Sequence, residues 1–220
     1  MSPTRKPKLL DLCGGEGGAA KGYADAGFEV VGVDIRPQPR YPHEFIQADA
    51  IEVLRDRTFV TSFDAIHMSW PCQGFKKGTL WRDSPDLVTS GRELALAYGM
   101  PWVIENVMEA PLDRNRSIVL CGEMFGLRTI RHRRFEPSPG LTLVAPQHAR
   151  HKRRTAHSRR REMWELGYHA SFTGDIGTYA GPEGMGIDWM TGNGLSEAIP
   201  PAYARWVGRQ LMAAIAGVAA

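Results

Sequence analysis

The chain has 220 residues, of which 43% are hydrophobic and 23% are charged, with a formal net charge of +3. This composition is that of an ordinary water-soluble globular protein, and the length allows one α/β domain with a full core. No apolar run is long enough to span a bilayer, and the apolar stretch after the basic N-terminus is too short for the core of a signal peptide. These features exclude an integral membrane protein, and we expect a cytoplasmic one.

The number and spacing of the cysteines indicate whether disulfides or a metal motif are expected. Cys13, Cys72 and Cys121 lie far apart in the sequence and are odd in number. Their number argues against a disulfide framework, and no pair has the short spacing of a metal-binding motif. We therefore expect reduced thiols and no metal site.

The first part of the chain predicts a βαβ unit with a glycine-rich turn. Residues 8–13 form an apolar run that indicates a buried strand, and residues 14–18 consist of four glycines around one glutamate. Residues 19–26 then predict a helix, and residues 29–33 a second strand that ends at Asp34. Glycines let a ligand approach the backbone closely, and a carboxylate in this position can accept hydrogen bonds from ribose hydroxyls.

Two cofactors fit this turn. The pattern Gly15-x-Gly17-x-x-Ala20 satisfies the relaxed dinucleotide fingerprint, so an NAD enzyme is allowed. The same geometry also binds the adenosine of S-adenosylmethionine. The glycines alone do not choose between these two cofactors.

The next elements continue the alternation of strands and helices. Residues 45–47 predict a third strand, after which Asp49 can cap a helix over residues 50–56 or contact an adenine ring. A fourth strand over residues 63–69 leads to Cys72. The pattern of the first half therefore favours an open, mostly parallel sheet.

The stretch Ser69-Trp70-Pro71-Cys72-Gln73-Gly74-Phe75 places a cysteine just beyond this fourth strand. Open α/β sheets carry their chemistry outside the carboxyl ends of the strands. Pro71 fixes one backbone dihedral before the thiol, and Gly74 allows a sharp turn after it. Near a positive charge, such a thiol would be largely thiolate. The alternative is a small buried core cysteine, the commoner fate of a single Cys.

A partner for this cysteine follows the fifth strand. A helix that begins at Ser84-Pro85 precedes a strand over residues 100–104, which ends in Glu105. Neighbouring parallel strands end at the same sheet edge, so Glu105 can reach a base held at Cys72. Burial would raise the pKa of this carboxyl group and let it carry a proton at neutral pH.

A basic strand is expected over residues 128–136, after a possible short strand at residues 118–120. Alternate residues of a strand share a face, so Arg131 and Arg133 should point together, with Ile130 and His132 opposed. This pair next to a carboxylate indicates an anionic or polar substrate.

The region from residue 137 to 185 is rich in charge, glycine and proline. Residues 148–161 hold seven arginines and lysines and no acid, which we interpret as a phosphate-contacting element. A helix over residues 202–216 closes the chain.

Together these stretches resemble the DNA (cytosine-5) methyltransferases, most closely their compact phage and prophage forms. The likeness covers nearly the whole chain and is carried by four motifs in the family's order, which are Asp11-Leu12-Cys13-Gly14-Gly15-Glu16-Gly17-Gly18, Pro71-Cys72-Gln73-Gly74-Phe75, Glu105-Asn106-Val107 and Arg131-His132-Arg133-Arg134-Phe135. The Pro-Cys-Gln and Glu-Asn-Val pair decides against NAD. The resemblance implies a Rossmann-like methyltransferase fold, with a catalytic core (1–136), a short basic target-recognition insertion (137–185) and a C-terminal segment that completes the core (186–220).

The resemblance also implies a mechanism. Cys72 would add to C6 of a flipped-out cytosine and make C5 nucleophilic toward the methyl group of S-adenosylmethionine. Glu105 would contact N3 and the exocyclic amine, and Arg131 and Arg133 would hold the O2 side of the base.

The remaining expected roles are binding roles. The implied cofactor-binding residues are Asp11, Cys13, Gly15, Glu16, Gly17, Asp34, Ile35, Asp49, Ala50 and Pro71. The implied DNA-binding residues are Gln73, Lys76, Lys77, Arg153, Arg154, Arg159 and Arg160. The expected partner is double-stranded DNA, with no membrane, and we expect a monomer in a bacterial or phage-infected cell, in a phage or restriction-modification setting.

Two other functions stay open at this stage. The tRNA-directed relatives share these motifs, so an RNA cytosine methyltransferase is one alternative. A DNA-binding protein on an inactive methyltransferase core is the other, although Cys72, Glu105 and the paired arginines argue against it. The sequence departs from the family's usual pattern at Cys13, Gly14, Lys76 and Thr129.

Overall fold

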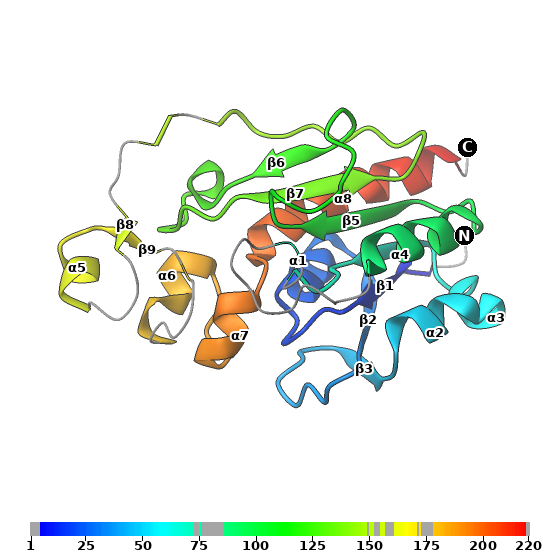
Figure 1. Ribbon diagram of the computed structural model, residues 1–220, viewed down its shortest axis with the longest axis horizontal. Coiled ribbons are helices and arrows are strands. Elements are labelled where there is room, and N and C mark those ends of the chain that lie inside the picture. Colours follow the sequence, from blue (N-terminus) through cyan, green and yellow to red (C-terminus); the bar gives the residue numbers. More distant parts are fainter. Residues whose placement is uncertain are drawn as a thin grey trace.

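The fold is organised around a seven-stranded sheet with strand order β3-β2-β1-β4-β5-β7-β6 (Figure 1). The computed structural model describes residues 5–72, 75, 86–148, 150–151, 155–156, 161–170, 172 and 178–218. The strands are β1 (Lys8–Leu12), β2 (Glu29–Asp34), β3 (Glu44–Gln47), β4 (Ala65–Met68), β5 (Trp102–Asn106), β6 (Ile118–Leu120) and β7 (Arg133–Pro137). Neighbours among β3, β2, β1, β4 and β5 pair in parallel, whereas β7 is antiparallel to β5 and β6. The predicted mostly parallel sheet is confirmed, and β7 is the strand that runs antiparallel to its neighbours.

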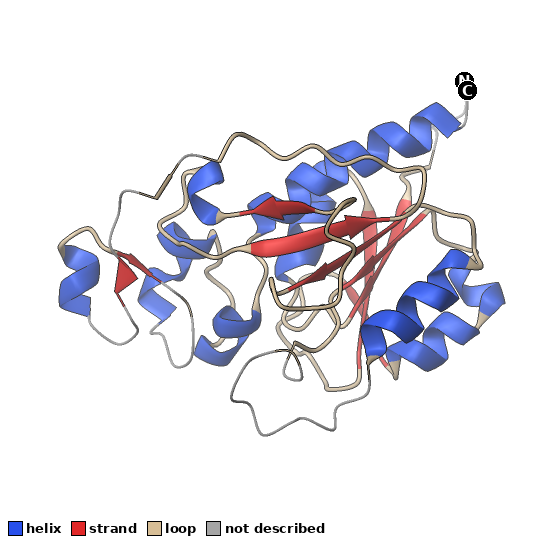
Figure 2. Ribbon diagram, turned by 45° about the horizontal axis from the view of Figure 1, so that its top comes forward, coloured by secondary structure: helices blue, strands red, loops and turns tan. Residues whose placement is uncertain are grey.

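Helices cover both faces of this sheet (Figure 2). The α-helices are α1 (Gly18–Ala26), α2 (Ala50–Arg55), α3 (Arg57–Val60), α4 (Leu87–Leu96), α5 (Arg161–Glu165), α6 (Gly181–Met185), α7 (Gly192–Glu197) and α8 (Pro201–Val218). Two 3-10 helices, η1 (Gly122–Phe125) and η2 (Thr178–Ala180), and a two-stranded parallel pair, β8 (Thr155–Ala156) and β9 (His169–Ala170), complete the described structure.

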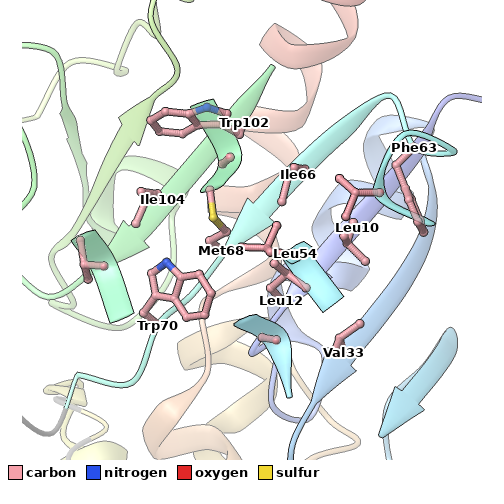
Figure 3. Close-up of a cluster of buried hydrophobic side chains, with 14 of the residues drawn as sticks. Leu10, Leu12, Val33, Leu54, Phe63, Ile66, Met68, Trp70, Trp102 and Ile104 are labelled. Carbon is pink, nitrogen blue, oxygen red and sulfur yellow. The ribbon is translucent and has the colours of Figure 1, made fainter. Parts of the chain in front are cut away.

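The two faces of the sheet bury alternate residues of the same strands. Leu10 and Leu12 of β1 pack with α2, α3 and α4, whereas Leu9 packs with α1 and α8. Figure 3 shows the first of these clusters, in which strand residues such as Met68 and Ile104 meet Leu54 of α2. This burial on both faces explains why the strands read as continuous apolar runs rather than as alternating ones.

Helices α1 and α8 pack closely against each other on one face. Gly22 of α1 makes this approach possible, because a Cβ atom there would lie 2.1 Å from the carbonyl oxygen of Pro201 and 2.8 Å from the Cβ of Ala204. One face of the sheet is therefore covered by a tightly packed pair of helices. In the part of the chain that the structure describes, no helix is long and apolar enough to span a bilayer.

Several predicted boundaries differ from the observed ones. The helix expected over residues 50–56 is present as α2, and the unpredicted α3 follows it directly, because the side chain of Asp56 accepts a hydrogen bond from the N–H of Phe59 and starts a new helix. The expected cap at Ser84-Pro85 lies outside the described residues, and α4 begins after Asp86, which accepts from the N–H of Thr89. The expected strand over residues 128–136 is regular only from Arg133.

The C-terminal third of the chain also contains a smaller apolar cluster. It gathers Phe172, Met185 and Leu195 with other residues between 170 and 195, and α5, α6 and α7 lie together away from α2 and α3 (Figure 1). The division of the chain into three parts at residues 136 and 185 stays a prediction.

Candidate active site

The glycine turn between β1 and α1 leaves the backbone of one residue, Gly15, accessible to a ligand. The chain enters the left-handed region at Cys13 (φ 58°), Gly15 (φ 53°) and Gly17 (φ 85°). A Cβ atom added at Gly17 would lie 2.4 Å from the side chain of Pro42, whereas one at Gly15 would meet nothing within 4 Å. Gly17 is therefore required by packing, and Gly15 presents backbone that a ligand can approach.

Asp34 at the end of β2 is tied to this turn. One carboxylate oxygen accepts from the N–H of Gly15 at 3.3 Å, and the other accepts from the N–H of Arg36 at 3.0 Å. An ionised carboxylate can accept about four hydrogen bonds, so capacity remains for hydroxyl donors. The next side chain, Ile35, is 65% exposed, which places an apolar surface beside the carboxylate.

Asp49 and Ala50 extend the same edge beyond β3. The Asp49 side chain accepts from the N–H groups of Ile51 at 2.8 Å and Glu52 at 3.1 Å, so its predicted capping role is confirmed. Ala50 is buried at the start of α2. An adenine contact by Asp49 stays a prediction.

Asp11 lies beneath the glycine turn and has no exposed surface. Its two carboxylate oxygens are 2.8 Å from Nδ1 of His67 and 2.8 Å from the hydroxyl of Tyr41. A Cβ atom at Gly14 would lie 2.2 Å from the Asp11 carboxylate. The contacts that the structure gives Asp11 therefore support the turn from within. Sequence reasoning missed His67 and Tyr41, although His67 stands out as the polar residue of an apolar strand.

Glu16 contacts the C-terminal part of the chain. Its carboxylate accepts from the N–H of Thr191 at 2.8 Å and from the Thr191 hydroxyl at 2.5 Å, and its carbonyl oxygen accepts from the indole N–H of Trp189 at 3.0 Å. Thr191 also caps α7. Glu16 therefore joins the glycine turn to α7, a link that no local sequence signal indicated.

The loop that carries Cys72 is anchored by the residue two positions before it. Trp70 is almost completely buried among the side chains of the cluster in Figure 3. A Cβ atom at Gly91 of α4 would lie 2.1 Å from the Trp70 ring, so α4 approaches the ring closely. Pro71 is exposed and Cys72 is half-buried. Cys72 thus lies at the sheet edge, as predicted, half-buried and packed against the rim of this cluster.

Glu105 lies in β5, next to β4 in the sheet, where Met68 pairs with Ile104. The carboxylate is 97% buried, one oxygen accepts from the hydroxyl of Ser69 at 2.8 Å, and the other lies 3.2 Å from Nε of Arg133. The sequence argument, based on burial alone, did not include this positive charge or Ser69. The sequence feature that could have indicated Ser69 is its position at the end of the fourth predicted strand.

Asn106 connects the same two strands one residue further on. Its amide nitrogen donates to the carbonyl oxygen of Trp70 at 2.9 Å, and its amide oxygen accepts from the N–H of Val107 at 2.8 Å. Asn106 therefore fixes the start of the Cys72 loop against the end of β5.

The two arginines differ in their surroundings. Arg133 begins β7 and reaches Glu105, but Arg131 precedes the strand, so the prediction that they share one strand face is wrong. The Arg131 guanidinium is buried and donates to the carbonyl oxygens of Phe172 at 2.9 Å and Ser196 at 2.8 Å. Arg131 is thereby held by the C-terminal third of the chain.

The charge of Arg131 acts on the other predicted catalytic groups. Burial and the neighbouring Arg133 lower the pKa of Arg131 to about 9, while the charges of Glu105 and Cys72 oppose the shift. The guanidinium stays charged at neutral pH and lies within electrostatic reach of Cys72, Glu105 and Arg133. The structure thus brings all four predicted catalytic residues to one edge.

The predicted DNA-binding residues cannot be placed in the same way. Gln73, Lys76, Lys77, Arg153, Arg154, Arg159 and Arg160 lie outside the described residues. Of the basic stretch, Arg150 and Arg161 are described, and both are exposed. The DNA-binding roles stay predictions.

The topology defines an α/β protein with a Rossmann-like methyltransferase fold. No protein-family model matches the sequence, and no curated protein matches it. Among solved structures, the chain is similar to a candidate DNA modification methyltransferase encoded within an Escherichia coli prophage, with a TM-score of 0.62, 14% identity, and coverage of 94% of this chain and 99% of that one. It is also similar to a methyltransferase of Entamoeba histolytica, with a TM-score of 0.57, 11% identity, and coverage of 96% and 99%. At these identities the similarity shows a shared fold, and the predicted fold class is confirmed.

Proposed function

We propose that the chain is a DNA (cytosine-5) methyltransferase that acts through a covalent bond between Cys72 and the base. The observation that carries the proposal is the arrangement around Glu105. This carboxylate is buried, bonded to Ser69 and paired with Arg133, beside the strand that leads to Cys72. The name of the prophage protein with the same fold specifies DNA modification, which supports DNA as the substrate.

The residues at the carboxyl ends of β1, β2 and β3 fit S-adenosylmethionine. Gly15 offers open backbone, Asp34 retains acceptor capacity for ribose hydroxyls, and Ile35 offers an exposed apolar surface for adenine. When bound, this cofactor supplies an electrophilic methyl group on a sulfonium. The other cofactor roles, of Asp11, Cys13 and Glu16, are indirect in this proposal, since the described contacts of Asp11 and Glu16 are to protein groups.

Each residue of the site then has a separate role in the reaction. The Cys72 thiolate forms a bond to C6 of the cytosine and pushes electron density into the ring. Glu105 faces the N3 side, where that charge develops, and Arg133 fixes the position of the carboxylate. Arg131 adds a buried positive charge on the O2 side. After C5 gains the methyl group it loses its proton to a base, and the S–C6 bond breaks to restore the thiolate and the aromatic ring.

The test is trapping of the covalent bond. Duplex DNA that contains 5-fluoro-2′-deoxycytidine is incubated with the protein and S-adenosylmethionine, because fluorine cannot leave C5 as a proton does. We expect a protein–DNA adduct on the peptide that contains Cys72, and 5-methyl-2′-deoxycytidine in ordinary DNA. The Cys72→Ala variant should give neither, while the control variant Ser62→Ala, which removes a hydroxyl bonded to the carbonyl oxygen of Phe59 before β4 begins, should still form the adduct.

Two outcomes contradict the proposal. Methylation of ordinary DNA by Cys72→Ala at a rate near that of the unmodified protein excludes Cys72 as the nucleophile. Methylation of tRNA transcripts but not of DNA, measured in the same assay, identifies the RNA-directed alternative.

A further inference from the structure

Four potential metal ligands meet at the end of β6 and the start of β7. Cys121 directly follows β6, and His132 directly precedes β7, which pairs with β6 so that Leu120 faces Arg133. His148 and His151 come from the segment after β7. One ligand atom from each of Cys121, His132, His148 and His151 lies within 4.8 Å of all the others. We refer to these four residues as the Cys-His cluster.

The separations within the Cys-His cluster suit a tetrahedral ion. The Nε2 atoms of His132 and His151 are 3.2 Å apart. Two nitrogens bound at 2.0–2.1 Å to a tetrahedral Zn²⁺ lie about 3.3 Å apart. The His148 ring is also close, with its centroid 4.7 Å from that of His151 and 5.3 Å from that of His132. Three imidazoles and one thiol therefore converge on one point.

Neighbouring groups orient the side chains of the Cys-His cluster. The carboxylate of Glu123 pairs with Nδ1 of His151, which places the proton on that nitrogen and leaves the lone pair of Nε2 facing His132. A carboxylate behind a histidine in this way is the common outer partner of a metal-bound imidazole. The backbone N–H groups of Gly122, Glu123 and Arg131 face the Cys121 sulfur, while burial raises the pKa of its thiol.

We infer that Cys121, His132, His148 and His151 bind one Zn²⁺ ion as a structural site. One sulfur and three imidazole nitrogens are ligands that zinc accepts, and four protein ligands leave no open position for a substrate. The earlier expectation of no metal site considered only the spacing between cysteines. The four ligands come from separate segments, and only His148 and His151 are close in sequence.

The position of the Cys-His cluster suggests what the ion does. His132 lies between Arg131 and Arg133, so an ion bound to His132 fixes the segment that carries both arginines. His148 and His151 begin the basic stretch that we expect to contact phosphates. The ion therefore ties that stretch to the edge where the base is expected to bind. It acts as a positioning element and not as a catalytic one.

Metal content tests the inference directly. The full chain is purified without a polyhistidine tag or chelator, and bound metal is measured by mass spectrometry. We expect about one zinc per chain, and a loss of most of it in Cys121→Ser and in His151→Ala. The matched controls are Cys72→Ser and His43→Gln, which lie outside the Cys-His cluster and should keep the zinc. Glu123→Gln leaves all four ligands in place and should weaken zinc affinity roughly 10- to 100-fold.

Cobalt gives a readout that does not depend on the folding of variants. After zinc removal, Co²⁺ added to the unmodified protein should give the visible bands of a tetrahedral ion and the near-ultraviolet band of a cobalt–thiolate bond. Folded, unmodified protein that keeps less than about 0.1 zinc per chain after incubation with zinc overturns the inference. Cobalt spectra of an octahedral ion, without the thiolate band, also overturn it. Cys72→Ser separates this result from the proposed function, because it should lose methylation and retain zinc.

Discussion

The hydroxyl of Ser69 donates a hydrogen bond to the buried carboxylate of Glu105 over 2.8 Å. Ser69 follows β4 and Glu105 belongs to β5, so this bond fixes the loop that leads to Cys72 against the carboxylate expected to face the base. On the other side, Nε of Arg133 lies 3.2 Å from the second carboxylate oxygen, an ion pair without hydrogen-bond geometry. Glu105 is thus oriented from two directions before any substrate binds, which is the preorganisation that stabilisation of a charged transition state needs.

Ser69→Ala should therefore reduce methyl transfer without removing a reacting group. A hydrogen bond to a charged group contributes about 1.5–3 kcal/mol, which corresponds to a loss of roughly 10- to 100-fold in kcat/KM. Initial rates with labelled S-adenosylmethionine and DNA measure the effect. Ser62→Ala is the control, because the Ser62 hydroxyl bonds to the carbonyl oxygen of Phe59 before β4 begins. Equal rates for the two variants would show that Glu105 does not depend on Ser69.

Asp34→Ala should weaken cofactor binding. Asp34 is the carboxylate at the end of β2, and a lost hydrogen bond to a charged group lowers the binding free energy by about 1.5–3 kcal/mol. Calorimetry with S-adenosylmethionine measures the change. Asp25→Ala is the control, since Asp25 forms a half-exposed ion pair with Lys21 on α1. An unchanged affinity in Asp34→Ala would move the ribose contact to another residue, and tight binding of NADH would restore the rejected dinucleotide function.

The elements that could be predicted are those with a local cause. Mostly apolar runs predicted strands β1, β2 and β4 within two residues, because both faces of this sheet are buried. Asp49 was correctly expected to cap a helix, since the cap and the helix are adjacent in sequence. The convergence of Cys72 and Glu105 followed from the rule that parallel strands end at one edge.

The remaining features depend on contacts between distant segments. The backbone pairing of β7 begins at Arg133, after Arg131, whose guanidinium is held by carbonyl groups of Phe172 and Ser196. No periodicity of residues 128–136 can show these contacts. The link from Glu16 to Thr191 and the Cys-His cluster arise in the same way. Each joins residues that are far apart in the sequence.

Glu136→Gln should strongly destabilise the fold. Glu136 has no exposed surface, and its carboxylate accepts from Arg92 at 2.8 and 2.9 Å, from Arg116 at 3.2 Å and from the N–H of Asp113 at 2.8 Å. Removal of one partner of a buried ion pair costs about 3–5 kcal/mol, because the other charge is left uncompensated. Arg92 and Arg116 are partly exposed, so we expect the lower end of this range.

Urea unfolding followed by circular dichroism measures this free energy. Glu52→Gln is the control, because Glu52 pairs with Arg55 on the surface of α2, and such pairs contribute at most about 1 kcal/mol. A change of less than about 1 kcal/mol in Glu136→Gln would show that the two arginines reach water and need no partner.

The last prediction concerns DNA binding by the basic stretch. Simultaneous replacement of Arg153, Arg154, Arg159 and Arg160 by glutamine should weaken binding to all DNA sequences alike, because contacts to phosphates position a protein without reading bases. If all four contact phosphates, the slope of log affinity against log salt should fall in magnitude by up to about 3.6, at roughly 0.9 for each phosphate neutralised.

The control must remove the same charge elsewhere. The control residues are at the end of the sheet opposite the site, with Lys6 before β1, Lys8 at the start of β1, Arg55 at the end of α2 and Arg57 at the start of α3. Their replacement by glutamine should leave the salt slope nearly unchanged. A recognition region of about fifty residues places few side chains in the major groove, and each good base contact gives about 1–3 kcal/mol of discrimination. We therefore expect methylation of a short or degenerate site, which bisulfite sequencing of DNA from expressing cells measures. A long, strictly defined methylated motif would show that the recognition region reads bases far better than its composition suggests. An equal loss of affinity in both quadruple variants would show that the basic stretch does not act as a phosphate-binding element.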